Sequence, residues 1–164
     1  MFDHVLLNGV LQMITAWIGA LGFSLIFNVR RDLLPAAAFG GMADWGVYML
    51  ADWFFGGSGV FLPSVVAAAF ASIYSEAMAK MEKVPATVFY IPALIPMVPG
   101  GSLYYTMYYA VMGEWEKVQS YGSSTLYCAL GIAVGMSLVL SVDFTFRKLM
   151  AMRQTKTKYE TSPP

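Results

Sequence analysis

One carboxylate stands where a charged group is costly. Asp44 lies inside residues 33–51, a run that carries no other charge, and small residues surround it in the sequence. A carboxylate within an apolar helix is rare unless it faces a cavity or carries a proton. We therefore interpret Asp44 as a functional residue that binds a substrate ammonium group or relays protons. The structural alternative is a carboxylate near the surface of a tilted helix, or one paired with a partner chain.

A proline-rich segment could form a second part of the same site. Residues 91–101 read Ile-Pro-Ala-Leu-Ile-Pro-Met-Val-Pro-Gly-Gly. Each of the three prolines removes a backbone N–H donor and pushes the preceding residue out of the helical region, and the two glycines can adopt left-handed angles. The segment predicts two short helices, roughly over 84–95 and 101–113, joined by unwound backbone near the middle of a membrane.

Unwound backbone at that depth offers free carbonyl and N–H groups to a ligand. The N–H groups at the start of the second short helix could hold a carboxylate, because a helix N-terminus favours negative charge. We therefore predict a substrate and ion pathway formed by Asp44, Pro96, Pro99, Gly100, Gly101 and Ser102, with Asn28 near the inner end of the first apolar run. The alternatives are a proline-kinked packing helix for the segment and a hydrogen bond between helices for Asn28.

Long uncharged runs must carry these residues. The chain of 164 residues is 58% apolar and only 12% charged, whereas soluble domains carry about 25% charged residues. A bilayer needs about 20 apolar residues for each crossing helix. Five runs fit this length, at 5–29, 33–51, 53–75, 84–113 and 118–142. The sequence therefore predicts an all-α polytopic membrane protein with five transmembrane helices, the fourth of them broken at the proline-rich segment.

The basic residues give this fold an orientation. With the N-terminus outside and five crossings, nine lysines and arginines face the inside and only Lys117 faces the outside. An excess of positive charge marks the cytoplasmic side. If 84–113 were a hairpin that does not cross, the basic residues would divide five against five. We therefore predict an N-out and C-in topology, with a transmembrane domain over residues 1–146 and a basic cytoplasmic tail over residues 147–164.

The composition excludes several kinds of chemistry. One cysteine, Cys128, and one histidine, His4, do not suffice for an internal disulfide or a multi-histidine metal site. Equal numbers of basic and acidic residues give no support to a nucleic-acid partner. We expect no catalytic residues, no metal site and no cofactor. Glu76 and Asp143 are interpreted as interface residues at the inner ends of two spans, with lining of the pathway as the alternative.

Small residues predict where the helices meet. Gly131 and Gly135 form a GxxxG motif in the fifth run, and Ser64, Ala68 and Ser72 recur every four residues in the third. Such patterns allow transmembrane helices to approach closely. They indicate packing faces and no more.

Two segments resemble a known family. Residues 22–29, Gly-Phe-Ser-Leu-Ile-Phe-Asn-Val, and residues 91–100, from Ile91 to Gly100, resemble signature stretches of the threonine/serine exporter (ThrE-like) family. The match is to its small, YjjB-type subunit, which corresponds to the C-terminal half of the fused exporter. The resemblance implies a multi-pass protein of the bacterial inner membrane that exports small carboxylate-bearing metabolites with the proton gradient. It also implies a larger membrane subunit that resembles the N-terminal half of the family.

We therefore expect the small subunit of a two-component exporter of threonine or serine, and an oligomer is compatible with this reading. One alternative is a dicarboxylate exporter, since some split-type members of the family are associated with succinate. An ionised Asp44 beside a dianion is unfavourable, which favours an amino acid. The other alternative is a structural partner that only stabilises a larger transporter. In that case a substitution of Asp44 would leave transport intact.

Overall fold

Every regular element of the described chain is a helix. The computed structural model describes the backbone of residues 2–57 and 59–160, and the side chains of 8–57 and 59–145. The elements are α1 (Phe2–Ile26), α2 (Leu34–Phe54), α3 (Phe61–Glu82), α4 (Thr87–Leu94), the 3₁₀ helix η1 (Ile95–Met97), α5 (Gly100–Met112) and α6 (Trp115–Glu160). Within these residues the predicted all-α class is confirmed.

Among the residues that the structure describes, three helices are long and apolar enough to cross a membrane. They are the part of α1 from Asn8 to Ile26, the whole of α3, and the part of α6 from Trp115 to Thr145. The pair formed by α4–η1 and α5, bent by 48°, is a fourth candidate. The predicted second span corresponds to α2, which is 21 residues long but is less apolar because it carries two aspartates, three glycines and two tryptophans. The count of five and the N-out orientation therefore stay predictions.

The predicted break in the fourth run is confirmed in the backbone. Pro92 lies inside α4, the chain then tightens into η1, and Val98 leaves the helical region with a ψ of 123°. A new helix begins at Gly100. The cause is local, because three prolines remove the N–H donors that would continue a single helix.

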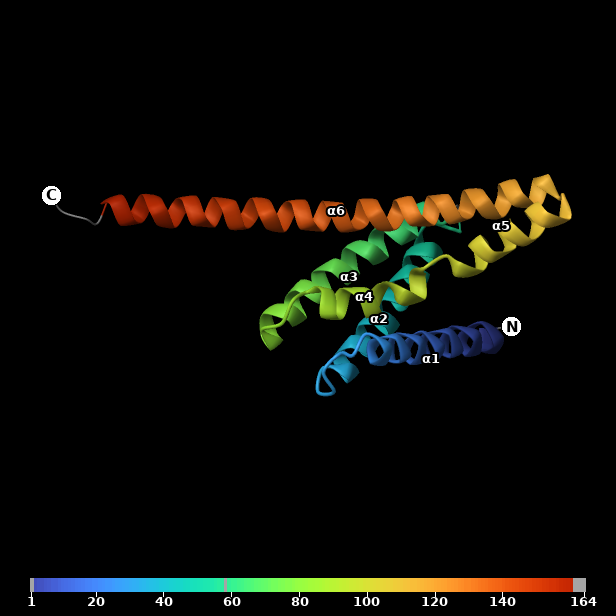
Figure 1. Cartoon of the computed structure of the whole chain (residues 1–164), viewed down its shortest axis with the longest axis horizontal. Helices are drawn as coiled ribbons and strands as arrows, with labels where there is room; N and C mark the ends of the chain where they lie inside the picture. The colour runs from blue at the N-terminus through green and yellow to red at the C-terminus, as the bar shows by residue number, and fades with distance from the viewer. Residues whose placement is uncertain (1, 58, 161–164) are drawn as a thin grey trace.

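α2 occupies the middle of the bundle. It packs against α1, α3, α4 and η1, whereas α5 packs against α6 and α6 in turn packs along α3. Figure 1 shows α6 following the long axis of the molecule, with α5 folded back on its N-terminal end. The helix continues through the predicted basic tail as far as Glu160, while the side chains of that segment and residues 161–164 lie outside the described part. The domain boundary at residue 146 stays a prediction.

The predicted small-residue faces of α3 and α6 meet. A Cβ added to Gly131 would lie 2.7 Å from the Phe61 carbonyl oxygen and 2.8 Å from Ser64 Cβ. One added to Gly135 would collide with the Val65 carbonyl oxygen. The two backbones therefore touch at positions where any side chain would separate them, which is how GxxxG motifs act in membranes.

Candidate functional site

Asp44 lies in the interior of the bundle. Its side chain is 0% exposed, and neither carboxylate oxygen has a hydrogen-bond partner among the described residues. A buried charge without a partner costs several kcal/mol, so such a group is normally neutralised by a proton or by a bound cation. The alternative of a carboxylate near the surface of a tilted helix does not fit this burial.

The helix that carries Asp44 contacts the broken segment directly. Gly41 lies one turn before Asp44 on α2, and a Cβ there would be 3.1 Å from the Pro92 carbonyl oxygen and 3.4 Å from Pro96 Cγ. It would also lie 2.5 Å from Ala20 Cβ on α1. Glycine is therefore required for α1, α2 and the break to meet. The helix that carries Asp44 therefore packs against the segment that carries Pro96, and a site shared by the two residues stays a prediction.

Two further helices hold the end of the break. The Cys128 thiol on α6 donates to the Met97 carbonyl oxygen at 3.5 Å, and it accepts a hydrogen bond from Ser64 Oγ on α3, also at 3.5 Å. The Met97 carbonyl is one of those that an uninterrupted helix would have bonded within itself. The single cysteine is thus a buried structural group beside the break.

The start of α5 differs from the expectation. Gly100 and Gly101 are helical and do not adopt the left-handed angles that the glycine pair allowed. Both are exposed, and a Cβ added to either would meet nothing within 4 Å. Their backbone freedom is not used, because the break is already formed at Val98 and Pro99 and the glycines only begin the next helix.

The predicted carboxylate-binding site at the start of α5 also has fewer free N–H groups than expected. The Gly100 N–H donates to the Val98 carbonyl oxygen at 2.7 Å, so this amide is already engaged. Of the three amides predicted to bind a carboxylate, this leaves those of Gly101 and Ser102. They belong to α5, which packs against α6, whereas Asp44 belongs to α2. The helix of Asp44 therefore packs against the prolines of the break, whereas this turn belongs to a helix that packs against α6.

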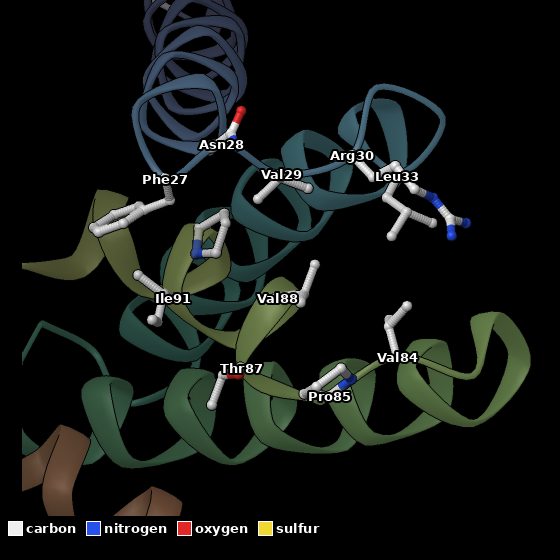
Figure 2. Close-up of a pocket in the computed structure, with 11 residues that line it drawn as sticks. Phe27, Asn28, Val29, Arg30, Leu33, Val84, Pro85, Thr87, Val88 and Ile91 are labelled. Carbon is white, nitrogen blue, oxygen red and sulfur yellow. The ribbon is translucent and has the colours of Figure 1, made fainter.

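Asn28 lies at a separate cavity of about 320 Å³, between the α1–α2 connection and α4. Asn28 has a φ of 54°, the left-handed conformation that Asn tolerates better than most residues. In Figure 2 its side-chain oxygen points away from Val88 and Ile91, so the cavity walls are chiefly apolar. Both segments that resemble the exporter family line it, one through Phe27–Val29 and the other through Ile91 and Pro92.

Arg30, which lines this cavity, forms a charged pair with Asp32. Arg30 Nε and a terminal guanidinium nitrogen each donate to Asp32 at 2.6 Å. The hydrogen bond from Arg30 holds the pKa of the Asp32 carboxyl below its ordinary value. Both side chains are exposed, so the pair contributes little to stability.

Sequence reasoning missed the polar neighbours of Asp44. Tyr90 on α4 is close enough to interact electrostatically with Asp44, and its hydroxyl lies beside the Ser72 side chain. Tyr90 Oη and Ser75 Oγ are buried and have no geometrically sound hydrogen bond among the described residues. In the sequence, Tyr90 precedes the break and the serines lie among the small residues of the third run. Both patterns indicate helix packing and gave no reason to expect a functional role.

These features first indicate the class to which the protein belongs. Three or four apolar helices long enough to cross a bilayer, with a broken helix against a buried carboxylate, are typical of a multi-pass membrane transporter. Residues 12–142 match the family described as "Threonine/Serine exporter, ThrE". The chain therefore belongs to the threonine/serine exporter family, whose members are transporters and not enzymes. No solved structure matches it.

Within residues 8–57 and 59–145, no three His, Cys, Asp or Glu side chains are grouped so that they could hold a metal ion.

Proposed function

We propose that this chain is the small subunit of a two-component, proton-coupled exporter of small amino acids, threonine or serine. The observation that carries the proposal is the buried carboxylate of Asp44, which has no partner among the described side chains and lies on the helix that contacts the break. The substrate class is supported by the family to which the chain belongs.

Asp44 supports coupling because a proton and an ammonium group can compete for it. A buried carboxylate is stable when protonated or when paired with a cation, and unstable when bare. If the substrate ammonium binds, Asp44 must release its proton; if the substrate leaves, a proton must return. One positive charge is thereby exchanged for another, which links amino-acid export to proton entry.

The other predicted residues take subsidiary roles in this proposal. The prolines Pro96 and Pro99 hold the backbone open beside α2. The amides of Gly101 and Ser102, on the helix that packs against α6, are a separate place for a substrate carboxylate along the pathway. Asn28 belongs to the cavity at the opposite end of α4, which would admit substrate from the basic side of the bundle. A larger membrane subunit covers the apolar surfaces that these helices expose.

The test is export from proteoliposomes that contain the chain and its larger partner, loaded with threonine or serine. Asp44→Asn keeps the shape and polarity of the side chain but removes the titrating group. It should abolish transport driven by an imposed pH gradient, while protein level and subunit association stay near normal. Asp52→Asn is the matched control, because Asp52 lies two turns further along α2 and is only partly buried.

Three outcomes would overturn parts of the proposal. Gradient-driven export at the wild-type rate by Asp44→Asn would show that this carboxylate is not the coupling group. Export of succinate without export of threonine or serine would replace the amino-acid substrate by a dicarboxylate. Full activity of the single chain without a second subunit would remove the two-component assignment.

A further inference from the structure

Polar side chains on α3 lead away from Asp44 toward one end of the bundle. Ser72 is 3% exposed and lies beside the Tyr90 hydroxyl, which in turn lies within electrostatic range of Asp44. Glu76 and Lys80 follow Ser72 at intervals of four residues, so these three side chains share one face of α3. These side chains form a polar line along one face of α3, from Ser72 to Lys80.

The line ends in an ion cluster at the surface. Lys80 Nζ lies 3.8 Å from Glu76 Oε2 on the same helix and 3.6 Å from Asp143 Oδ1 on α6. Side-chain exposure rises to 22% at Glu76 and 61% at Lys80. The cluster lies at the end of the bundle that carries most of the basic residues, which is the predicted cytoplasmic end.

Two buried hydroxyls, one of them that of Tyr90 beside this line, are poorly explained by packing. A buried hydroxyl without a hydrogen bond costs about 1–3 kcal/mol, and both Tyr90 Oη and Ser75 Oγ are in this position among the described residues. Tyr74 shows the ordinary arrangement nearby, since its hydroxyl donates to the Ala36 carbonyl oxygen at 2.7 Å. Phenylalanine at position 90 and alanine at position 75 would fill the same space without this penalty.

We propose that Tyr90, Ser72 and Glu76 form the proton pathway between Asp44 and the basic end of the bundle. The inference rests on the proposed function, because it takes Asp44 as the group that exchanges its proton for the substrate. It also makes Glu76 a pathway residue and not only an interface residue. The Glu76 carboxylate lies 3.8 Å from Lys80 Nζ and is partly exposed, so a proton that reaches it can pass on to water.

The transfer is balanced at each group. A hydroxyl can accept one hydrogen bond and donate another. When the substrate ammonium displaces the Asp44 proton, Tyr90 Oη accepts this proton and releases its own toward Ser72. Ser72 gives up its 2.8 Å hydrogen bond to the Ala68 carbonyl oxygen and passes a proton on toward Glu76. One proton leaves Asp44, one reaches the Glu76 carboxylate and then bulk water, and both hydroxyls end neutral.

The experiment compares two modes of transport in the complete complex in proteoliposomes. Export driven by a pH gradient requires net proton movement, whereas exchange of labelled for unlabelled threonine at equal pH does not. Tyr90→Phe should slow gradient-driven export by roughly tenfold or more, which is within the contribution of a positioned proton-transfer group. Exchange should stay within about twofold of wild type, because Asp44 is intact. Tyr74→Phe, the same change on a neighbouring hydroxyl, should alter neither mode.

Glu76→Gln provides an independent test at the other end of the line. It should reproduce the selective loss of gradient-driven export, and Glu76→Asp should restore most of it. Protein level and subunit association are measured for every variant, and Ser72→Ala replaces Tyr90→Phe if the latter fails to accumulate.

The possible results separate this inference from the proposed function. If Tyr90→Phe and Glu76→Gln both export at the wild-type rate while Asp44→Asn does not, the pathway is wrong and the role of Asp44 stands. If Asp44→Asn also keeps full export, both proposals fail. Equal loss of both transport modes in Tyr90→Phe would make Tyr90 a substrate-binding residue and would overturn its assignment to the pathway.

Discussion

At the scale of single residues, the glycines at the helix contacts and the buried carboxylate of Asp44 depend on each other. Gly41 allows α2 to touch the break, and Gly131 and Gly135 allow α6 to touch α3. These contacts close the bundle around Asp44, which could not lose its water if the helices stood further apart. Glycine lowers the intrinsic stability of a helix by about 0.5–1 kcal/mol relative to alanine, so its presence here is explained by close approach and not by helix propensity.

We expect Gly135→Ala to weaken this packing. The added Cβ would collide with the Val65 carbonyl oxygen, and backbone cannot move aside as a flexible side chain can. The free energy of unfolding should fall by roughly 1–3 kcal/mol, as for other overpacked sites. Gly19→Ala is the matched control, because a Cβ there meets nothing within 4 Å. Equal stability of the two variants in detergent unfolding would contradict the close contact.

At the scale of elements, the broken helix is the feature on which the site depends. Two half-helices, α4–η1 and α5, meet at 48° because prolines interrupt the hydrogen bonding between them. The first half packs into the bundle against α2 and α3, while the second leaves it and packs against α6. The two half-helices therefore pack against different helices, and a straight helix could not contact both sets.

We expect the joint substitution of Pro92, Pro96 and Pro99 by alanine to straighten this region. Restored N–H donors would continue the α-helix through Val98, and the ends of the pair should move apart by about 3 Å, from helix lengths of 1.5 Å per residue. Spin labels at Thr87 and Met112 would report this distance by pulsed electron paramagnetic resonance. Pro35→Ala, at the exposed start of α2, should leave the distance unchanged. An unchanged distance in the triple variant would show that tertiary packing and not proline sets the bend.

At the scale of the whole molecule, the charges divide the bundle into two ends. The α1–α2 connection, the end of α3 and the ion cluster of the proposed proton pathway lie toward one end, where basic residues collect. The first turn of α6 carries Lys117, whose ammonium group lies 4.6 Å above the Tyr109 ring and contacts Glu114 at 2.6 Å. Positive charge marks the cytoplasmic side, so the two ends should face different compartments.

This orientation is testable with single cysteines in a Cys128→Ala background. Glu82→Cys, at the end of α3, should react with a membrane-impermeant thiol reagent only after the cells are opened. Glu114→Cys, in the turn before α6, should react in intact cells with a permeable outer membrane. Reaction of both positions from the same side would contradict the five-span, N-out arrangement.

The sequence by itself determined the features that depend on local pattern. Asp44 stood out because its neighbours carry no charge, the break because prolines act on their own backbone, and the close α3–α6 contact because small residues recur at helical spacing. The family also followed from two short segments, and residues 12–142 match it. Each of these depends on residues near one another in the chain, so no knowledge of the fold was needed.

Only the tertiary structure decided which of these features share a site. Gly100 and Gly101 belong to the same motif as Pro96, yet they begin a helix that turns toward α6, while Pro96 contacts α2. Tyr90 and Ser72 gave no chemical signal in the sequence, yet the fold brings the Tyr90 hydroxyl beside Ser72 and within electrostatic range of Asp44. The physical reason is that each helix can be rotated about its own axis. The face that it turns toward the interior depends on how the small residues of its neighbours fit against it. That fit is a property of three or four helices together, and no single segment encodes it.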